Sequence, residues 1–387
     1  MKTIASAIVG IAISVTGFTQ EIKFKKLQID KEFRGEAVTA FDVNKDGKVD
    51  IVTDQFWYEA PAWKPHEIRT PRAWRLVPNE YSQSFCMFHE DVNRDGWEDY
   101  IVVRFPGEPM HWVENPKGKD GHWTDHVLYR SASNESPTYL DITGDGKRDM
   151  IMGIEPEQQM AWFGPDPSDP NKPWTMHPIS GPKSPGGQRF SHGLGVGDVN
   201  GDGRADLIIS AGWYEAPADR NESNWKWHPR QFSGDGTAAQ MYTYDVNGDG
   251  KADVICSSAH KTGIWWNEQR VDADGVVTWT RHVIDKTFAE THGVRFEDLD
   301  GDKVPELITG KRFYSHGAGG EPGWDQPAVL VYFKLEGKGD DAKWVRNDID
   351  NDSGVGTHFE VADVNGDGKL DIIINNKKGL FYFEQAK

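Results

Sequence analysis

Apolar residues along this chain occur in short runs separated by polar stretches rich in Gly, Asn and Asp. Seven of the runs share one form, an acidic residue followed mainly by aliphatic residues. They read DIVTD (50–54), DYIVV (99–103), DMIMG (149–153), DLIIS (206–210), DVICS (253–257), ELITG (306–310) and DIIIN (371–375). Short apolar runs bounded by turn residues are typical of buried β-strands, so the pattern predicts an all-β protein.

The acid that opens each run is the last residue of a nine-residue loop, DxNxDGxxD in its commonest form. Carboxylates at positions one, five and nine, with an oxygen side chain at position three, are hard ligands suited to Ca²⁺. Glycine at position six permits the sharp turn. An EF-hand would place its last acid at position twelve between helices, whereas these loops join strands. The predicted ligands are Asp42, Asn44, Asp46, Asp50, Asp91, Asn93, Asp95, Asp99, Asp141, Thr143, Asp145, Asp149, Asp198, Asn200, Asp202, Asp206, Asp245, Asn247, Asp249, Asp253, Asp298, Asp300, Asp302, Glu306, Asp363, Asn365, Asp367 and Asp371.

The sixth loop departs from the pattern. Lys303 replaces the glycine, Glu306 replaces the last aspartate, and Asp300 occupies position three. Weak binding is one reading of this loop, and substitution of the cation by the Lys303 amine is the other. The formal net charge is −18, and seven bound Ca²⁺ ions would reduce it to −18 + 14 = −4. Much of the acidity is therefore explained by up to seven structural calcium ions.

A second motif recurs between the loops. An aromatic pair is followed by a polar connection and then by an aromatic-x-His-x-aliphatic strand, as in residues 56–68 and 265–284. Each unit thus has four strands, and seven such units predict a seven-bladed β-propeller. The last unit is one strand short, so the N-terminal EIKFKKLQI is expected to supply its outer strand and close the ring. Residues 21–387 are accordingly expected to form one domain.

These loops resemble the FG-GAP/VCBS repeats of integrin alpha subunits and of many secreted bacterial proteins. The resemblance covers essentially all of the expected mature chain and implies the propeller fold, which serves both adhesion and catalysis. The aromatic-rich, single-propeller form is also similar to the propeller domain of aldos-2-ulose dehydratase and related sugar lyases. The cupin domains of the dehydratase have no counterpart in this sequence.

Residues 1–20, MKTIASAIVGIAISVTGFTQ, are typical of a secretory signal peptide, because the apolar run is too short to span a membrane. The mature protein is therefore expected in the periplasm or outside the cell, with no membrane span. The negative charge argues against nucleic acid as a partner. Cys86 and Cys256 are the only cysteines, which excludes a disulfide framework.

Histidines outside the repeat give the candidate chemistry. Five of the 13 belong to the repeated outer strand and are assigned to packing or to a repeated hydrogen bond: His66, His126, His177, His228 and His282. Residues six positions before each calcium loop lie at the other end of the innermost strand, about 20 Å away at roughly 3.3 Å per residue. All seven should meet at the mouth of the central channel. They are Glu36, Phe85, Glu135, His192, Ala239, His292 and Thr357, with His358 one position further on.

The strands that follow the loops return to the same mouth. Their ends contribute further candidates, and the segment GKRFYSHGAGGEPGWDQP (310–327) is the richest, with cations, Tyr, His and a glycine run. The candidate catalytic residues are His192, His292, His358, His260, Arg104, Lys311, Arg312, Tyr314, His316, Glu36 and Glu135. His192, His292 and His358, with a carboxylate, are also candidate ligands of a catalytic Zn²⁺ or Mn²⁺.

Two classes of function fit these observations. One is a secreted carbohydrate-active lyase or dehydratase that abstracts a proton from an oxidised (keto or uronic) sugar and eliminates. A neutral His or a Tyr would be its base, and Arg, Lys or a metal would stabilise the enolate. Hydrolysis by Glu36 and Glu135 is less favoured, because a cation-rich site suits elimination better. The alternative is a non-catalytic, calcium-stabilised propeller that binds a glycan or a protein.

Overall fold

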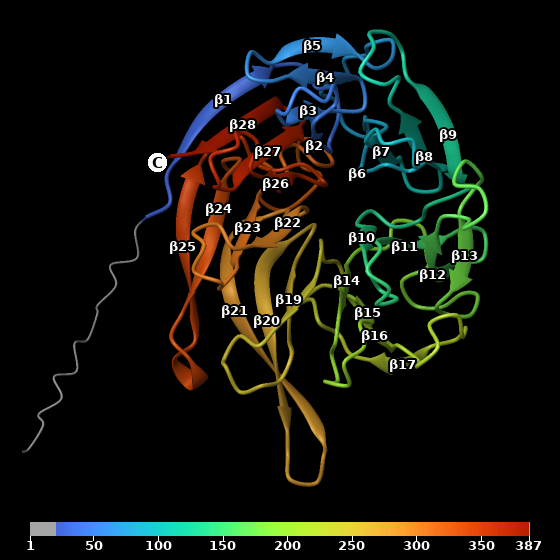
Figure 1. Cartoon of the computed structure of the whole chain (residues 1–387). Coiled ribbons are helices and arrows are strands. Elements are labelled where there is room, and N and C mark those ends of the chain that lie inside the picture. Colours follow the sequence, from blue (N-terminus) through green and yellow to red (C-terminus); the bar gives the residue numbers. More distant parts are fainter. Residues whose placement is uncertain (1–20, 387) are drawn as a thin grey trace, which may run out of the picture.

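The chain folds into seven four-stranded antiparallel sheets arranged around a central axis (Figure 1). The computed structural model describes residues 21–386, so the expected signal peptide lies outside the described residues. The prediction of an all-β, seven-bladed propeller is confirmed. No helix among residues 21–386 has the length and apolar character needed to cross a bilayer.

Within each sheet the strands follow chain order from the axis outward, except that the last sheet takes its outer strand from the N-terminus. The first three sheets are β2 (Thr39–Phe41), β3 (Asp50–Val52), β4 (Phe56–Glu59), β5 (Lys64–Glu67); β6 (Cys86–Glu90), β7 (Asp99–Val103), β8 (Met110–Glu114), β9 (Thr124–Tyr129); and β10 (Thr138–Leu140), β11 (Asp149–Ile154), β12 (Gln159–Gly164), β13 (Thr175–Pro178). The next three are β14 (Leu194–Gly197), β15 (Asp206–Ile209), β16 (Gly212–Glu215), β17 (Lys226–Pro229); β18 (Tyr242–Tyr244), β19 (Asp253–Ser257), β20 (Thr262–Val271), β21 (Val277–Ala289); and β22 (Val294–Glu297), β23 (Glu306–Gly310), β24 (Leu330–Glu336), β25 (Lys343–Asp350). The last is β26 (Glu360–Ala362), β27 (Asp371–Asn376), β28 (Gly379–Gln385) and β1 (Phe24–Asp30).

The two ends of the chain share one sheet. Strand β1 pairs antiparallel with β28, with Phe24 opposite Gln385 and Leu27 opposite Tyr382. This pairing covers the edge that β28 would otherwise expose.

The core lies between neighbouring sheets. The second strand of every blade is buried along its whole length, which explains the uninterrupted apolar runs in the sequence. The five outer-strand histidines pack as expected, each stacked on a tryptophan of the third strand; the His177 and Trp162 ring centroids are 3.8 Å apart. These histidines are therefore part of the scaffold.

The acid at position nine of a loop ties that loop to its sheet. In the fourth loop the Asp206 carboxylate accepts hydrogen bonds from the backbone N–H groups of Val199 and Ala216, at 2.9 and 2.8 Å. Asp198 at position one accepts from the N–H of Gly203, whose φ is 82°. The loop thus turns around its own oxygen side chains, at the end of the strand opposite the candidate site.

Candidate metal centre at the channel mouth

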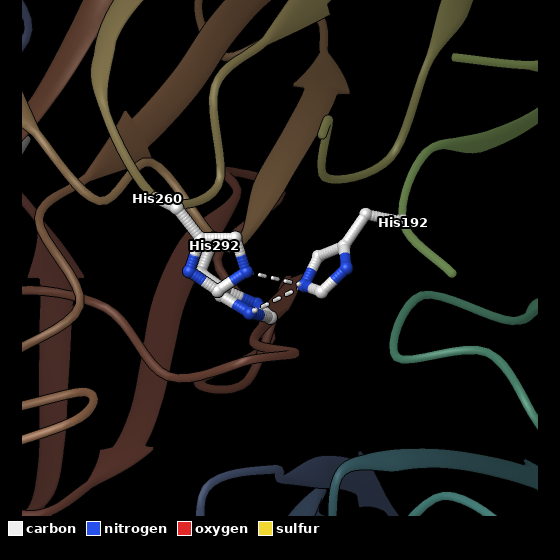
Figure 2. A group of neighbouring side chains, drawn as sticks. All are labelled: His192, His260 and His292. Carbon is white, nitrogen blue, oxygen red and sulfur yellow. Dashed lines mark hydrogen bonds between the residues drawn. The ribbon is translucent and has the colours of Figure 1, made fainter. Parts of the chain in front are cut away.

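Three histidines from three blades converge at the channel mouth. His192 and His292 each lie two residues before an inner strand, β14 and β22, and His260 lies in the turn between β19 and β20. The Nε2 atom of His192 is 3.0 Å from Nε2 of His260 and 3.3 Å from Nε2 of His292 (Figure 2). The three rings therefore direct one nitrogen each toward a common point.

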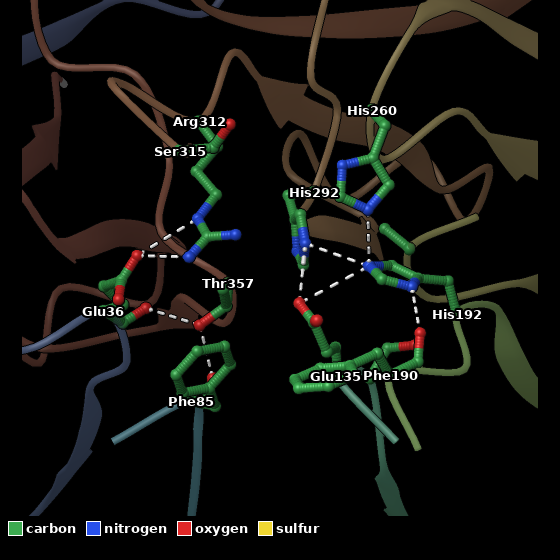
Figure 3. Close-up of polar contacts among 12 residues, drawn as sticks. Glu36, Phe85, Glu135, Phe190, His192, His260, His292, Arg312, Ser315 and Thr357 are labelled. Carbon is green, nitrogen blue, oxygen red and sulfur yellow. Dashed lines mark hydrogen bonds and ion pairs between the residues drawn. The ribbon is translucent and has the colours of Figure 1, made fainter. Parts of the chain in front are cut away.

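A buried carboxylate faces the same point. The Oε2 atom of Glu135 lies 3.2 Å from Nε2 of His292 and 3.4 Å from Nε2 of His192 (Figure 3). Burial acts to raise the pKa of Glu135, but the positive charge that His192 carries when protonated, together with hydrogen bonds from His192 and His292, outweighs it and holds the pKa well below its usual range. Glu135 is consequently an ionised ligand candidate.

The outward nitrogens of two of these histidines are held by acceptors. The Nδ1 atom of His192 donates to the carbonyl oxygen of Phe190 at 2.7 Å, and that of His260 donates to Oε1 of Glu321 at 3.1 Å. Since both partners act as acceptors, the proton of each neutral ring resides on Nδ1 and the lone pair on Nε2. The Nδ1 atom of His292 is buried and has no hydrogen-bond partner among residues 21–386.

Burial favours the neutral form of His260 and of His292. Burial, followed by the neighbouring His192, lowers the pKa of His260 to about 4. Burial, followed by the charge of Arg312, lowers the pKa of His292 well below its usual value. Neutral imidazoles and one carboxylate form the donor set that Zn²⁺ and similar divalent ions bind, so the residues fit such a metal.

A pocket of about 630 Å³ opens beside this cluster, a volume suited to a small-molecule ligand. The polar part of the lining is formed by Glu135, His192, His260 and His316. The aromatic part, or aromatic wall, consists of Tyr81, Phe85, Phe105 and Phe190, with Phe105 centred 5.6 Å from each of the other three rings.

Phe190 stands out in this aromatic wall. Its backbone φ is 62°, which a bulky residue rarely adopts, and its side chain is exposed. Its carbonyl oxygen accepts the hydrogen bond from His192. Phe190 therefore combines an unusual backbone conformation with two roles: it orients His192, a candidate metal ligand, and it lines the pocket.

Glu36 and Arg312 occupy the opposite side of the channel (Figure 3). The Nη2 atom of Arg312 is 2.5 Å from Oε1 of Glu36, and both side chains are only 1% exposed. The Oγ1 atom of Thr357 lies within hydrogen-bond distance of the carbonyl oxygens of Glu36 and Phe85. The residues six positions before the loops thus do meet, as two groups facing each other across the channel.

Lys311 and Tyr314 anchor the connection between β23 and β24 rather than line the pocket. The Nζ atom of Lys311 forms a buried ion pair with Glu290 at 2.7 Å. The carbonyl oxygens of Tyr314 and Ser315 accept hydrogen bonds from Nζ of Lys377, at 3.1 and 2.9 Å. This anchoring holds His316, two residues further on, at the pocket.

Two further predicted residues, His358 and Arg104, lie away from the channel-mouth pocket. His358 is buried elsewhere, with Nε2 2.8 Å from Nη2 of Arg295 and its ring against Phe88. Because side chains alternate along an extended chain, the single-residue offset from Thr357 turns it away. The prediction that His358 joins His192 and His292 as a ligand is wrong, and His260 takes that place.

Arg104 is the other residue that lies away from the cluster. Its Nη2 atom is 2.7 Å from Asp125 on the outer strand β9, and Nη1 approaches His111 on β8. Its side chain therefore runs outward along its own blade, away from the axis, and it is wrong to place Arg104 at the site.

Four site residues were not predicted from the sequence: Glu321, Tyr81, Phe105 and Phe190. Glu321 lies in the glycine-rich 310–327 segment, which the sequence already indicated as part of the site, so this acid could have been included among the candidates. The three aromatic residues precede or follow strands in connections of irregular length, where the repeat gives no equivalent position to compare.

Comparison with known proteins supports the fold. A model of the FG-GAP-like repeat matches residues 91–152 and 220–309, and a model of the FG-GAP repeat matches residues 190–220. No curated protein shows significant similarity over the chain.

Three solved structures that match this chain are remote from it in sequence. BBS1N, solved in complex with ARL6DN, has a TM-score of 0.52 at 9% identity, covering 95% of this chain and 97% of that one. Raptor from Chaetomium thermophilum has a TM-score of 0.50 at 9% identity, covering 95% and 29%. The V. cholerae biofilm matrix protein Bap1 has a TM-score of 0.46 at 11% identity, covering 95% and 91%. Together with the seven four-stranded sheets, the repeat matches identify this chain as a seven-bladed β-propeller with FG-GAP repeats.

Proposed function

We propose that this propeller is a secreted carbon–oxygen lyase or dehydratase acting on an oxidised sugar, keto or uronic, at the channel-mouth pocket. The observation that carries the proposal is the convergence of three histidine Nε2 atoms and the Glu135 carboxylate on one point beside the pocket. A divalent Zn²⁺ or Mn²⁺ held by His192, His260, His292 and Glu135 would supply Lewis-acid polarisation of a carbonyl or carboxylate oxygen.

The side chains around the pocket suit the proton transfers of an elimination. His316 donates through Nδ1 to Oε1 of Glu321 at 2.6 Å, which leaves its Nε2 as the nitrogen that accepts a proton. Burial raises the pKa of Tyr81 to about 12, so its phenol stays protonated at neutral pH and suits donation to a leaving hydroxyl. The aromatic wall offers ring faces for packing against the apolar face of a sugar.

Calcium and secretion belong to the same proposal. The DxNxDGxxD loops are turned around their oxygen side chains, and Ca²⁺ is the hard cation that such ligands suit. We assign these ions a structural role, because the loops lie at the far end of the inner strands from the pocket. A signal peptide at residues 1–20 would deliver the chain to the periplasm or the exterior, where calcium is plentiful.

A second candidate function is recognition of a protein or glycan without catalysis. Strands β20 and β21 form a hairpin that extends beyond the ring (Figure 1). It carries the exposed Val271, Val276 and Val277. Exposed apolar side chains on a projecting element are a feature of interaction surfaces.

The test is a search for unsaturated products by their absorbance, with keto-sugars and polyuronates as substrates. EDTA-treated protein should recover its fold on adding Ca²⁺, and should recover turnover only on adding Ca²⁺ together with Zn²⁺ or Mn²⁺. The double variant His192→Ala, His292→Ala should lose turnover, whereas His122→Ala, which alters an exposed outer histidine, should retain it. Turnover that survives the double variant contradicts the proposed site, and glycan binding without turnover of any substrate favours recognition.

A further inference from the structure

The connection between β23 and β24 brings an acid to the histidine cluster. Oε1 of Glu321 is 3.1 Å from Nδ1 of His260 and 2.6 Å from Nδ1 of His316. The two imidazole rings lie nearly parallel, with centroids 4.9 Å apart and an interplanar angle of 16°. One carboxylate oxygen therefore links a candidate ligand to a histidine on the pocket wall.

This contact fixes which nitrogen of His260 carries the proton. An ionised carboxylate only accepts hydrogen bonds, so Nδ1 of His260 must be the donor and Nε2 keeps its lone pair. That lone pair faces Nε2 of His192 at 3.0 Å. Acidic partners of this kind orient metal-binding histidines, and their loss commonly weakens metal affinity by about 10–100-fold.

We infer that Glu321 is a positioning residue of the centre, fixing the tautomer of His260 and holding His316 at the pocket. This inference rests on the proposed metal centre. It also explains why the 310–327 segment exists in one blade only: the segment carries the acid that the ring scaffold does not provide at this point.

The variant Glu321→Gln tests this role. A glutamine amide can donate to Nδ1 of His260, which moves the proton to Nε2 and blocks the lone pair. Asp325→Asn is the matched control, since Asp325 is an exposed acid on the same connection. The measurement is Zn²⁺ affinity by competition with a chromophoric chelator, in excess Ca²⁺, with thermal unfolding as the check on folding.

The expected result is Zn²⁺ binding weakened about 10–100-fold in Glu321→Gln and unchanged in Asp325→Asn. Wild-type binding that Glu321→Gln leaves intact would overturn the role of Glu321 and leave the metal centre standing. A wild-type protein that binds no Zn²⁺ through its histidines would overturn the centre itself and this role with it.

The sixth loop holds a largely buried lysine among its carboxylates. The Nζ atom of Lys334, on β24, contacts the carboxylates of Asp300, Asp302 and Glu306, the last two at 3.2 and 3.9 Å. The Lys334 side chain is only 12% exposed. In the first loop, by comparison, Lys48 reaches the single carboxylate of Asp46 from a side chain that is 49% exposed.

The other blades show what Lys334 replaces. At the same place on the third strand, five blades carry glutamate: Glu59, Glu114, Glu215, Glu268 and Glu384. In the fifth blade this glutamate faces the position-three asparagine, with Nδ2 of Asn247 3.1 Å from Oε1 of Glu268. The sixth blade substitutes both partners, so an asparagine–glutamate pair becomes the ion pair of Asp300 with Lys334.

We propose that the Lys334 ammonium group takes the place of the cation in the sixth loop. An ammonium group in contact with three carboxylates supplies positive charge to the turn, and it lies among side chains that a calcium ion would need as ligands. The amine is supplied by Lys334 and not by Lys303, which the sequence suggested. Because the sixth loop then binds no Ca²⁺, the seven loops together bind six calcium ions.

The number of Ca²⁺ ions bound per chain, measured by equilibrium dialysis, tests this proposal. Asp298→Asn alters position one of the sixth loop, and Asp198→Asn is the matched change in the fourth. We expect the wild type to bind six ions, Asp298→Asn to bind the same number, and Asp198→Asn to bind one fewer. A seventh ion in the wild type, or loss of one in Asp298→Asn, would overturn the proposal.

Discussion

Calcium removal should destabilise the propeller by an amount set by the number of loops that bind Ca²⁺. Six loops are expected to do so, since Lys334 replaces the cation in the sixth. Extracellular calcium modules bind with Kd values of about 10⁻⁴–10⁻³ M. At a Kd of about 0.1 mM and about 1 mM free Ca²⁺, each occupied loop adds roughly 1.4 kcal/mol to the free energy of unfolding. Six loops would together contribute about 8 kcal/mol.

That free energy converts to a measurable melting shift. The unfolding entropy of globular proteins is about 2.1 cal/mol/K per residue, or roughly 0.8 kcal/mol/K over residues 21–386. Thermal unfolding followed by tryptophan fluorescence should therefore show a Tm about 10 °C lower in EDTA than in 1 mM Ca²⁺. Asp245→Asn, which impairs one loop, should reduce the calcium-dependent shift by about 2 °C. A Tm that is the same in EDTA and in Ca²⁺ would refute the reasoning.

Three further outcomes follow from buried groups. Without a bound cation, burial raises the pKa of Asp99 to about 8 from near 4 in the unfolded chain, so the folded state retains a proton that the unfolded state has lost. Stability in EDTA should consequently fall from pH 5 to pH 8, and a higher Tm at pH 8 would contradict this. Cys86 and Cys256 are buried, and burial raises the pKa of the Cys256 thiol to about 12. A thiol reagent should therefore label neither cysteine in the native protein and both in denaturant. Labelling of the native protein would contradict their burial. Glu36→Gln leaves the Arg312 charge buried without its partner and should cost about 3–5 kcal/mol in urea unfolding, and a loss below about 1 kcal/mol would show that the pair is not needed.

The repeat made most of the fold predictable. Because one strand–loop–strand pattern recurs seven times, the sequence indicates the number of blades, the position of each loop and the packing role of the five outer-strand histidines. Equivalent positions on the inner strands also predict that His192, His292 and Glu135 meet, since symmetry brings one end of every inner strand to the axis.

Features that break the repeat were not predictable in the same way. His358 directly follows Thr357 in the sequence, and the alternation of side chains along the extended chain turns its imidazole away from the channel mouth. Glu321 and Phe190 lie in connections whose paths depend on contacts between distant segments. Lys334 lies on β24, which is separated from the sixth loop by β23 and a long connection. Only the register of β23 with β24 in the folded structure shows that Lys334, and not Lys303, faces the carboxylates of that loop.

The central claim is that His192, His260, His292 and Glu135 hold one divalent metal ion. The most direct test is titration of the calcium-saturated protein with Co²⁺, whose visible absorption bands report nitrogen ligands and are weak at all-oxygen sites. We predict bands that saturate at one Co²⁺ per chain in the wild type and that are lost in His192→Ala, His260→Ala and His292→Ala. Bands that persist unchanged in these variants, or a wild type that gives none, would contradict the claim.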